Sequence, residues 1–152
     1  MKKIILKSIL FIGIGFLLGN LIFNNNKDFF LKMKSTDTYY FLQEGVYLDY
    51  NNLQNNISKL SEKTIEKSHD KYYVYVGITK DKEVAELLKN IYEKKGYKIY
   101  QKERNISSRE FSENVNQFDW LIKETEEEEQ ILTIEKIVLA NYEEISKKST
   151  KE

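Results

Sequence analysis

The chain has 152 residues, which is room for one compact domain of ordinary size together with a membrane anchor. It contains no cysteine, so disulfides and thiolate zinc sites are excluded. The 24 basic residues balance the 24 acidic ones, and the chain lacks the basic surplus typical of proteins that bind nucleic acid.

The amino-terminal segment differs in composition from the rest of the chain. Residues 4–23 are almost wholly apolar, and about 20 apolar residues in a helix span the hydrocarbon core of a bilayer. Three lysines within the first seven residues favour a cytoplasmic amino terminus. A cleaved signal peptide is the alternative, but the stretch GNLIF at residues 19–23 offers no small-x-small cleavage site. We therefore predict an uncleaved single-pass anchor over residues 1–23 in the plasma membrane, with the remainder outside the cytoplasm.

Residues 24–37 form a predicted linker that is polar at its start and carries aromatic residues among lysines further on. Fully extended, such a linker reaches only about 45–50 Å. A domain that follows it is therefore expected to work close to the membrane.

Residues 38–104 alternate between two hydrophobic periods, one typical of strands and one typical of amphipathic helices. The predicted elements are a strand at 39–47, a helix around 53–60, a weak strand at 64–67, a strong strand at 71–78, a helix around 84–91 ending at Gly96, and a returning strand at 97–100. When Gly45 is placed over Gly77, the two halves align as a duplication at a separation of 32 residues. Two such halves pair into one antiparallel sheet with both helices on one face. The predicted fold class is α+β, a βαββαβ two-layer sandwich of the ferredoxin/RNP-like type.

The carboxy-terminal part is predicted to be a helical extension over residues 105–147. Ser107 to Glu110 fits a capping box, and the acidic run at 126–129 suits the first turn of a second helix. Both predicted helices carry an apolar stripe, one over 111–122 and one over 131–145, which indicates packing on the domain or on a partner. Residues 148–152 are predicted to be a disordered tail.

A search for catalytic chemistry finds little. His69 is the only histidine, it lies in a predicted turn, and no nucleophile is near it in sequence. Glycine-rich phosphate loops and metal-ligand spacings are absent from the sequence. We therefore predict that the protein is not an enzyme and uses no cofactor or metal.

The strand at 71–78 suggests a binding surface. Strict alternation directs Val74, Val76 and Ile78 towards the helices, and Lys71, Tyr73 and Tyr75 onto the other face of the sheet, which an antiparallel sheet can leave in water. Gln43 falls on the same face if the two halves are equivalent. Flat rings beside amide and ammonium donors suit a sugar polymer. In the alternative arrangement, Trp120 or the carboxy-terminal helices cover these tyrosines as a second core.

Three segments resemble the sporulation-related repeat (SPOR) domain family. Residues 42–47 (LQEGVY) are similar to its opening strand, and residues 73–78 (YVYVGI) with 81–85 are similar to its second strand and the following helix start. Residues 95–97 (KGY) resemble its turn into the last strand. The likeness covers about residues 38–104, which is less than half of the chain.

This resemblance implies a βαββαβ fold that binds peptidoglycan, especially glycan strands without stem peptides, on the exposed sheet face. The implied contacts are Gln43, Lys71 and Tyr73, and strand alternation adds Tyr75. The leading hypothesis is a non-catalytic glycan-binding protein tethered to the plasma membrane, acting in sporulation or cell division. The alternative is a protein-interaction scaffold of a membrane-associated complex that uses the carboxy-terminal helices to bind a protein partner. Nucleic acid is not an expected partner.

Overall fold

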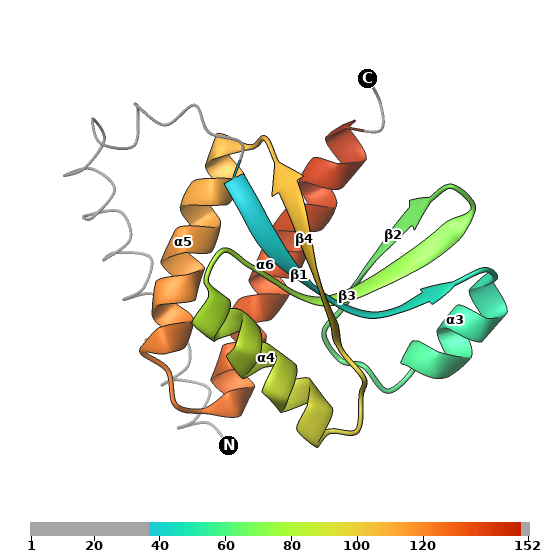
Figure 1. Cartoon of the computed structure of the whole chain (residues 1–152), viewed down its shortest axis with the longest axis horizontal. Coiled ribbons are helices and arrows are strands. Elements are labelled where there is room, and N and C mark those ends of the chain that lie inside the picture. The colour runs from blue at the N-terminus through green and yellow to red at the C-terminus, as the bar shows by residue number, and fades with distance from the viewer. Residues whose placement is uncertain (1–36, 150–152) are drawn as a thin grey trace, which may run out of the picture. The chain divides into compact units, whose positions relative to one another are not determined.

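The computed structural model of the chain describes residues 37–149, so the predicted anchor, the linker up to residue 36 and residues 150–152 lie outside the described part. The described part is α+β, as predicted (Figure 1). Its elements are β1 (Asp37–Tyr47), α3 (Tyr50–Ile57), β2 (Thr64–Ser68), β3 (Lys71–Thr79), α4 (Lys82–Lys94), β4 (Tyr100–Ile106), α5 (Arg109–Lys123) and α6 (Glu128–Ser149). None of the helices within residues 37–149 is both long and apolar enough to cross a membrane.

The four strands form one sheet in the order β2-β3-β1-β4, and every neighbouring pair is antiparallel. The returning strand begins at Tyr100, three residues later than predicted, because the residues just after α4 hydrogen-bond back to its last turn and form its cap. Gly96 adopts a φ of +88°, the backbone N–H of Gly96 donates to Glu93, and that of Tyr97 donates to Tyr92 at 3.1 Å. This is the left-handed cap expected of a glycine just beyond a helix.

Two β-bulges interrupt the pairing of β1 with β3. Leu42 pairs with Gly77 and Gln43 pairs with Tyr75, so Val76 is an extra residue on β3, and Glu44 is likewise extra on β1. A bulge changes which side chains share a face. The prediction that Ile78 faces the same way as Val74 and Val76 is therefore wrong, because Ile78 packs on the face that carries Tyr75.

Each face of the sheet has its own hydrophobic core. The first core contains Leu42, Val74 and Val76 from the strands, and the buried stripes of α3 and α4 cover it. The second core contains Tyr39, Phe41, Tyr75 and Ile78, and the stripes of α5 and α6 cover it. Figure 1 shows α3 and α4 along the lower side of the strands and α6 passing behind them. The predicted placement of both inner helices on one face is confirmed.

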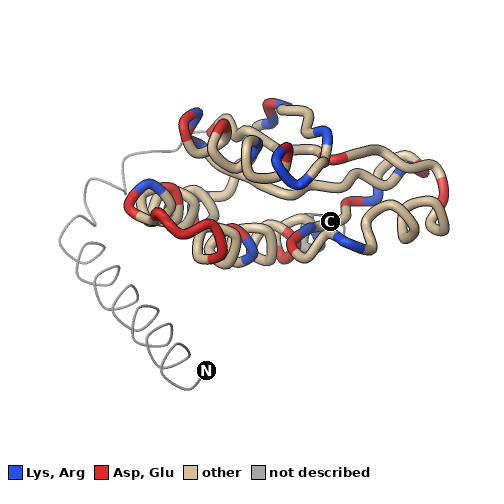
Figure 2. The backbone as a smooth tube through the Cα atoms, turned by 90° about the horizontal axis from the view of Figure 1, so that it is seen from below, with Lys and Arg blue, Asp and Glu red and all other residues tan. Residues whose placement is uncertain are grey.

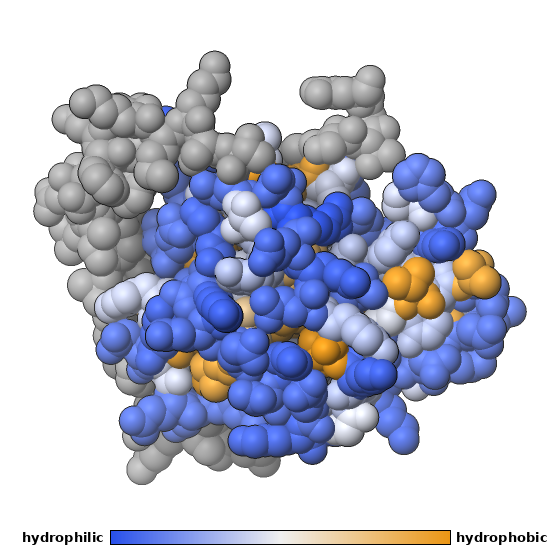
Figure 3. All heavy atoms as spheres, in the orientation of Figure 1, coloured by the Kyte–Doolittle hydropathy of each residue, from blue (hydrophilic) through white to orange (hydrophobic). Residues whose placement is uncertain are grey.

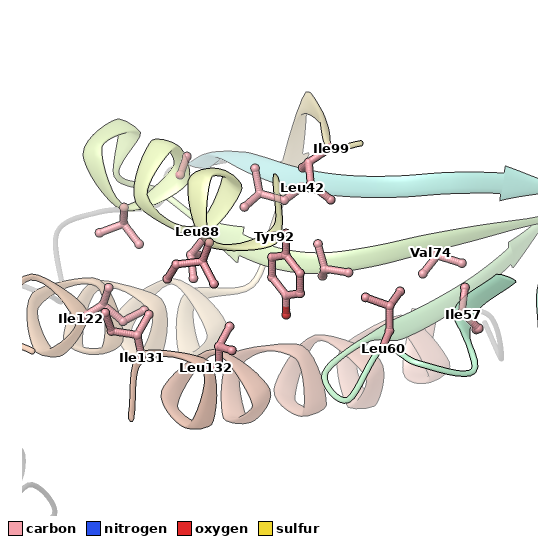
Figure 4. Close-up of a cluster of buried hydrophobic side chains, with 14 of the residues drawn as sticks. Leu42, Ile57, Leu60, Val74, Leu88, Tyr92, Ile99, Ile122, Ile131 and Leu132 are labelled. Carbon is pink, nitrogen blue, oxygen red and sulfur yellow. The ribbon is translucent and has the colours of Figure 1, made fainter. Parts of the chain in front are cut away.

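The two cores meet beyond Thr64, the first residue of β2. β2 pairs with β3 only from Thr64 to Ser68, so the outer edge of β3 is unpaired from residue 76 onward. Tyr92 of α4, and Ile131 and Leu132 near the start of α6, belong to the first core beside this edge (Figure 4). The helical extension therefore packs along a strand edge as well as on a sheet face.

Two acidic side chains satisfy the unpaired backbone of this buried edge. Glu135 of α6 is fully buried and accepts the backbone N–H of Ile78 at 2.7 Å. Asp119 of α5 accepts the backbone N–H of Lys80 at 3.0 Å and the hydroxyl of Thr79 at 2.5 Å. Without them, the backbone N–H of Ile78 would be buried without a partner, at a cost of about 1–3 kcal/mol, and that of half-buried Lys80, just beyond β3, would lose its acceptor.

Substitutions at two adjacent residues of α6 can test whether this helix packs as part of the fold. Val138 is 1% exposed and Ile137 is 41% exposed. We expect Val138→Asp to lower the free energy of unfolding by at least about 3 kcal/mol, because it buries an unpaired charge in the second core. Ile137→Asp is the matched control and should change it by less than about 1 kcal/mol. Urea denaturation followed by circular dichroism measures both. Equal effects would show that α6 is not packed on the sheet.

Candidate functional site

The face that carries Tyr73 and Tyr75 divides into a covered half and an open half. Tyr75 is 4% exposed, and its ring lies 5.0 Å from that of Phe41 and 6.5 Å from that of Tyr142 on α6. The prediction that this face is uncovered is therefore wrong at Tyr75. The alternative in which the carboxy-terminal helices form a second core is correct for this half, whereas Trp120 is not part of the cover, because it is 51% exposed.

Arg104 of β4 lies across the covered half. Its guanidinium carbon is 4.7 Å from the ring centroid of Phe41 and 5.7 Å from that of Tyr75. The guanidinium donates to both carboxylate oxygens of Glu66 on β2, at 2.8 and 3.2 Å, and to the hydroxyl of Tyr75 at 3.0 Å. The hydroxyl of Tyr142 donates to the same carboxylate at 2.5 Å. We call these four residues, Arg104, Glu66, Tyr75 and Tyr142, the Arg104 network.

The network ties the two outer strands of the sheet and α6 together through charge. Burial alone raises the pKa of Glu66, but the hydrogen bonds from Arg104 and Tyr142 outweigh it and leave this pKa below its ordinary value. Burial raises the pKa of the Tyr142 hydroxyl, and its bond to Glu66 raises it further. The network is therefore ionic at neutral pH and holds the cover in place. No local pattern marks Arg104 in the sequence, because its partner Glu66 lies on β2, at the opposite edge of the sheet.

The open half of the face lies beyond the reach of Tyr142. Strand register places Gln43 beside Tyr100 of β4, and Val46 beside Tyr73 of β3. Val46 and Tyr100 are 42% and 43% exposed, Gln43 and Tyr73 are half-buried, and Lys71 is exposed at the end of the strand. We call these five residues, Gln43, Val46, Lys71, Tyr73 and Tyr100, the open strip. Figure 3 shows hydrophobic atoms near the end of β1, where Val46 and Leu48 are exposed.

Three of the four predicted contact residues thus share one accessible surface. Gln43, Lys71 and Tyr73 belong to the open strip, and Tyr75 does not. Sequence reasoning missed Tyr100. Its residue type suits a sugar contact, but its place beside Gln43 follows only from the register of β1 with β4. The ring of Tyr100 lies 5.1 Å from the ammonium of Lys98, so an aromatic face and a cation are already adjacent there.

Two buried carboxyl groups have strongly altered acidity. Burial raises the pKa of Asp119 to about 6, and the hydrogen bonds from Thr79 and Lys80 only partly oppose this effect. Burial also raises the pKa of Glu135 well above its ordinary value, against the bond from Ile78. The second carboxylate oxygen of Glu135 has no hydrogen-bond partner among the described residues. No group of three or more acidic or histidine residues within 37–149 is arranged to hold a metal ion.

Comparison of the chain with protein-family models, with curated proteins and with solved structures finds no match in any of the three. The resemblance to the SPOR family therefore depends on the short segments given above.

The contribution of the Arg104 network to stability can be compared with that of a second arginine–glutamate pair, Arg109 with Glu113. We expect Arg104→Ala to lower the free energy of unfolding by about 1–2 kcal/mol, because Glu66 then lies half-buried without its cation. Arg109→Ala is the control, since Arg109 pairs with Glu113 on the exposed side of α5, and should cost less than about 0.5 kcal/mol. Thermal and urea unfolding measure both, and equal losses would contradict a structural role for the network.

The raised pKa of Asp119 predicts a pH dependence of stability. Between the ordinary value of 3.8 and about 6, the folded chain holds a proton that the unfolded chain has released. Stability therefore falls as the pH rises through this window, by about 3 kcal/mol for this group. Asp119→Asn keeps an acceptor for Lys80 and removes the ionisation. Urea titrations across the window should show a less negative slope for this variant, with the remaining slope set by Glu135 and, in the opposite sense, by Glu66 and Asp81, whose pKa values are lowered. An unchanged slope would contradict the assignment.

Proposed function

We propose that the chain is a non-catalytic peptidoglycan-binding protein, anchored in the plasma membrane, that holds denuded glycan strands on the open strip in sporulation or cell division. The observation that supports this most directly is the open strip. It presents the tyrosine rings of Tyr73 and Tyr100 on the same accessible surface as the amide of Gln43 and the ammonium of Lys71. Aromatic faces stack on sugar rings, and the polar groups can bind hydroxyl and acetamido groups.

The order of the elements adds support. The strand-helix-strand halves β1-α3-β2 and β3-α4-β4, with the sheet order β2-β3-β1-β4, agree with a ferredoxin/RNP-like sandwich, the fold that the SPOR resemblance implies. The proposed contact set differs from the sequence prediction in two ways. It omits Tyr75, which Tyr142 covers, and it includes Tyr100.

The alternative proposal is a scaffold that recruits a protein partner through α5 and α6. The apolar stripes that first suggested it face inward, because Phe111, Val115, Val138 and Tyr142 are buried in the second core. A protein partner would have to use the outer surfaces of these helices instead. Deleting residues 106–152 is therefore expected to expose the second core and unfold the domain.

Retention on cell-wall sacculi tests the glycan proposal. The part from Ser35 to Glu152 forms one compact unit, and we expect it to sediment with sacculi whose stem peptides have been removed by an amidase. The double variant Tyr73→Ala and Tyr100→Ala should reduce retention at least about tenfold, the loss expected for two stacked rings. Tyr50→Ala is the control, because Tyr50 is 56% exposed but lies outside the open strip.

Two outcomes of this experiment would contradict the proposal. Retention no greater than that of a carrier protein would refute glycan binding altogether. Equal retention of the double variant and the wild type would place any binding outside the open strip. Circular dichroism of each variant excludes a loss of fold as the cause.

A further inference from the structure

The only tryptophan of the chain, Trp120, lies exposed on α5. The buried stripe of α5 consists of Phe111, Val115, Asp119 and Ile122, and Trp120 falls outside it. Asn116, Trp120 and Lys123 are spaced at i, i+4 and i+7, so they share one side of the helix. A single exposed apolar side chain is common on protein surfaces, so the groups around Trp120 decide whether it marks a binding site.

This side of α5 faces the turn between β3 and α4 across an open pocket. The pocket has a volume of about 360 Å³ and is lined by Lys80, Asp81, Asn116, Asp119, Trp120 and Lys123. This volume is at the small end of the range for ligand pockets, about 300–1,000 Å³. The pocket therefore fits a small ring better than a folded partner.

The two cations that line the pocket, Lys80 and Lys123, are already paired with carboxylates of the protein. The ammonium of Lys80 lies 2.9 Å from the Asp37 carboxylate, and Lys123 contacts Asp81 and lies 3.2 Å from Glu83. Figure 2 shows a run of acidic positions along the connection from α5 to α6, close in sequence to Lys123. Neither ammonium is available as an uncompensated cation, which disfavours an anionic ligand such as a phosphate.

Hydrogen-bonding capacity remains in the pocket. The carboxylate of Asp119 accepts bonds from the hydroxyl of Thr79 and the backbone of Lys80 and interacts with the backbone of Asp81, whereas a carboxylate can accept about four bonds. Asn116 adds an exposed amide that both donates and accepts. One apolar platform with a few fixed polar groups around it is the arrangement that hydroxyl-bearing rings require.

We propose that this pocket binds one pyranose ring of a neutral saccharide, with the indole of Trp120 stacked on the ring and with Asp119 and Asn116 hydrogen-bonded to its hydroxyl groups. The pocket is at the end of β3 opposite the open strip, and Tyr73 and Lys80 are about 20 Å apart along the strand. It shares a ligand class with the function proposed above but no residue, so either proposal can fail alone.

The single tryptophan makes the test direct. The full chain is kept in a polyoxyethylene detergent, which has no sugar headgroup, and its indole emission is followed while a β-1,4-linked N-acetylglucosamine tetramer is added. We expect a saturating change in emission that persists in Tyr73→Ala. In Asn116→Ala, which keeps the fluorophore, the tetramer should bind about three- to tenfold more weakly. Gln117→Ala, an exposed neighbour outside the pocket, should leave the affinity unchanged.

The other outcomes overturn the proposal. Unchanged emission, while the wild type is retained on sacculi through Tyr73 and Tyr100, would reject the pocket and leave the open strip intact. A response to inorganic phosphate rather than to the tetramer would identify an anion site instead. If Trp120→Ala abolishes crosslinking to a protein while the tetramer has no effect, the exposed indole is a protein contact.

Discussion

The short length of β2 sets the constraint on which the rest of the domain depends. Because β2 begins only at Thr64, which pairs with Tyr75, the edge of β3 from residue 76 onward has no neighbouring strand, although it lies between two hydrophobic cores. Backbone donors in such a place need acceptors that only another element can bring. Glu135 and Asp119 provide them from α6 and α5. The helical extension is consequently an integral part of the domain and protects a strand edge that would otherwise be open to pairing with another chain.

The same packing limits the surface that remains for binding. Once α6 covers the unpaired edge of β3, its next turns extend over the adjacent sheet face and place Tyr142 above Tyr75. The Arg104 network then fixes this cover to both outer strands. Only the far end of the face, around Gln43 and Tyr100, stays accessible. The Arg104 network, with Arg104 and Glu66 half-buried, borders this accessible end of the face.

The two proposed sugar contacts lie at opposite ends of β3 and arise for different reasons. The open strip exists because α6 covers only half of a sheet face. The pocket at Trp120 exists because the side of α5 next to its buried stripe faces the turn after β3. Both place an accessible aromatic ring beside polar groups that can form hydrogen bonds, which suits the hydroxyl groups of a sugar. Neither site requires a group with catalytic chemistry.

The sequence by itself determined the elements and their order, because hydrophobic periodicity, the cap at Gly96 and the acidic start of the last helix are local signals. It also identified Gln43, Lys71 and Tyr73 as members of one surface. Only the tertiary structure decided that Tyr75 is buried under α6 and that Ile78 packs on the same face of the sheet as Tyr75. The bulge at Val76 depends on the pairing of β3 with β1, from Tyr47↔Tyr72 to Tyr40↔Thr79, which are far apart in the chain, and the cover depends on where a distant helix packs. An apolar stripe indicates that one side of a helix is buried, but it does not indicate the surface against which that side packs.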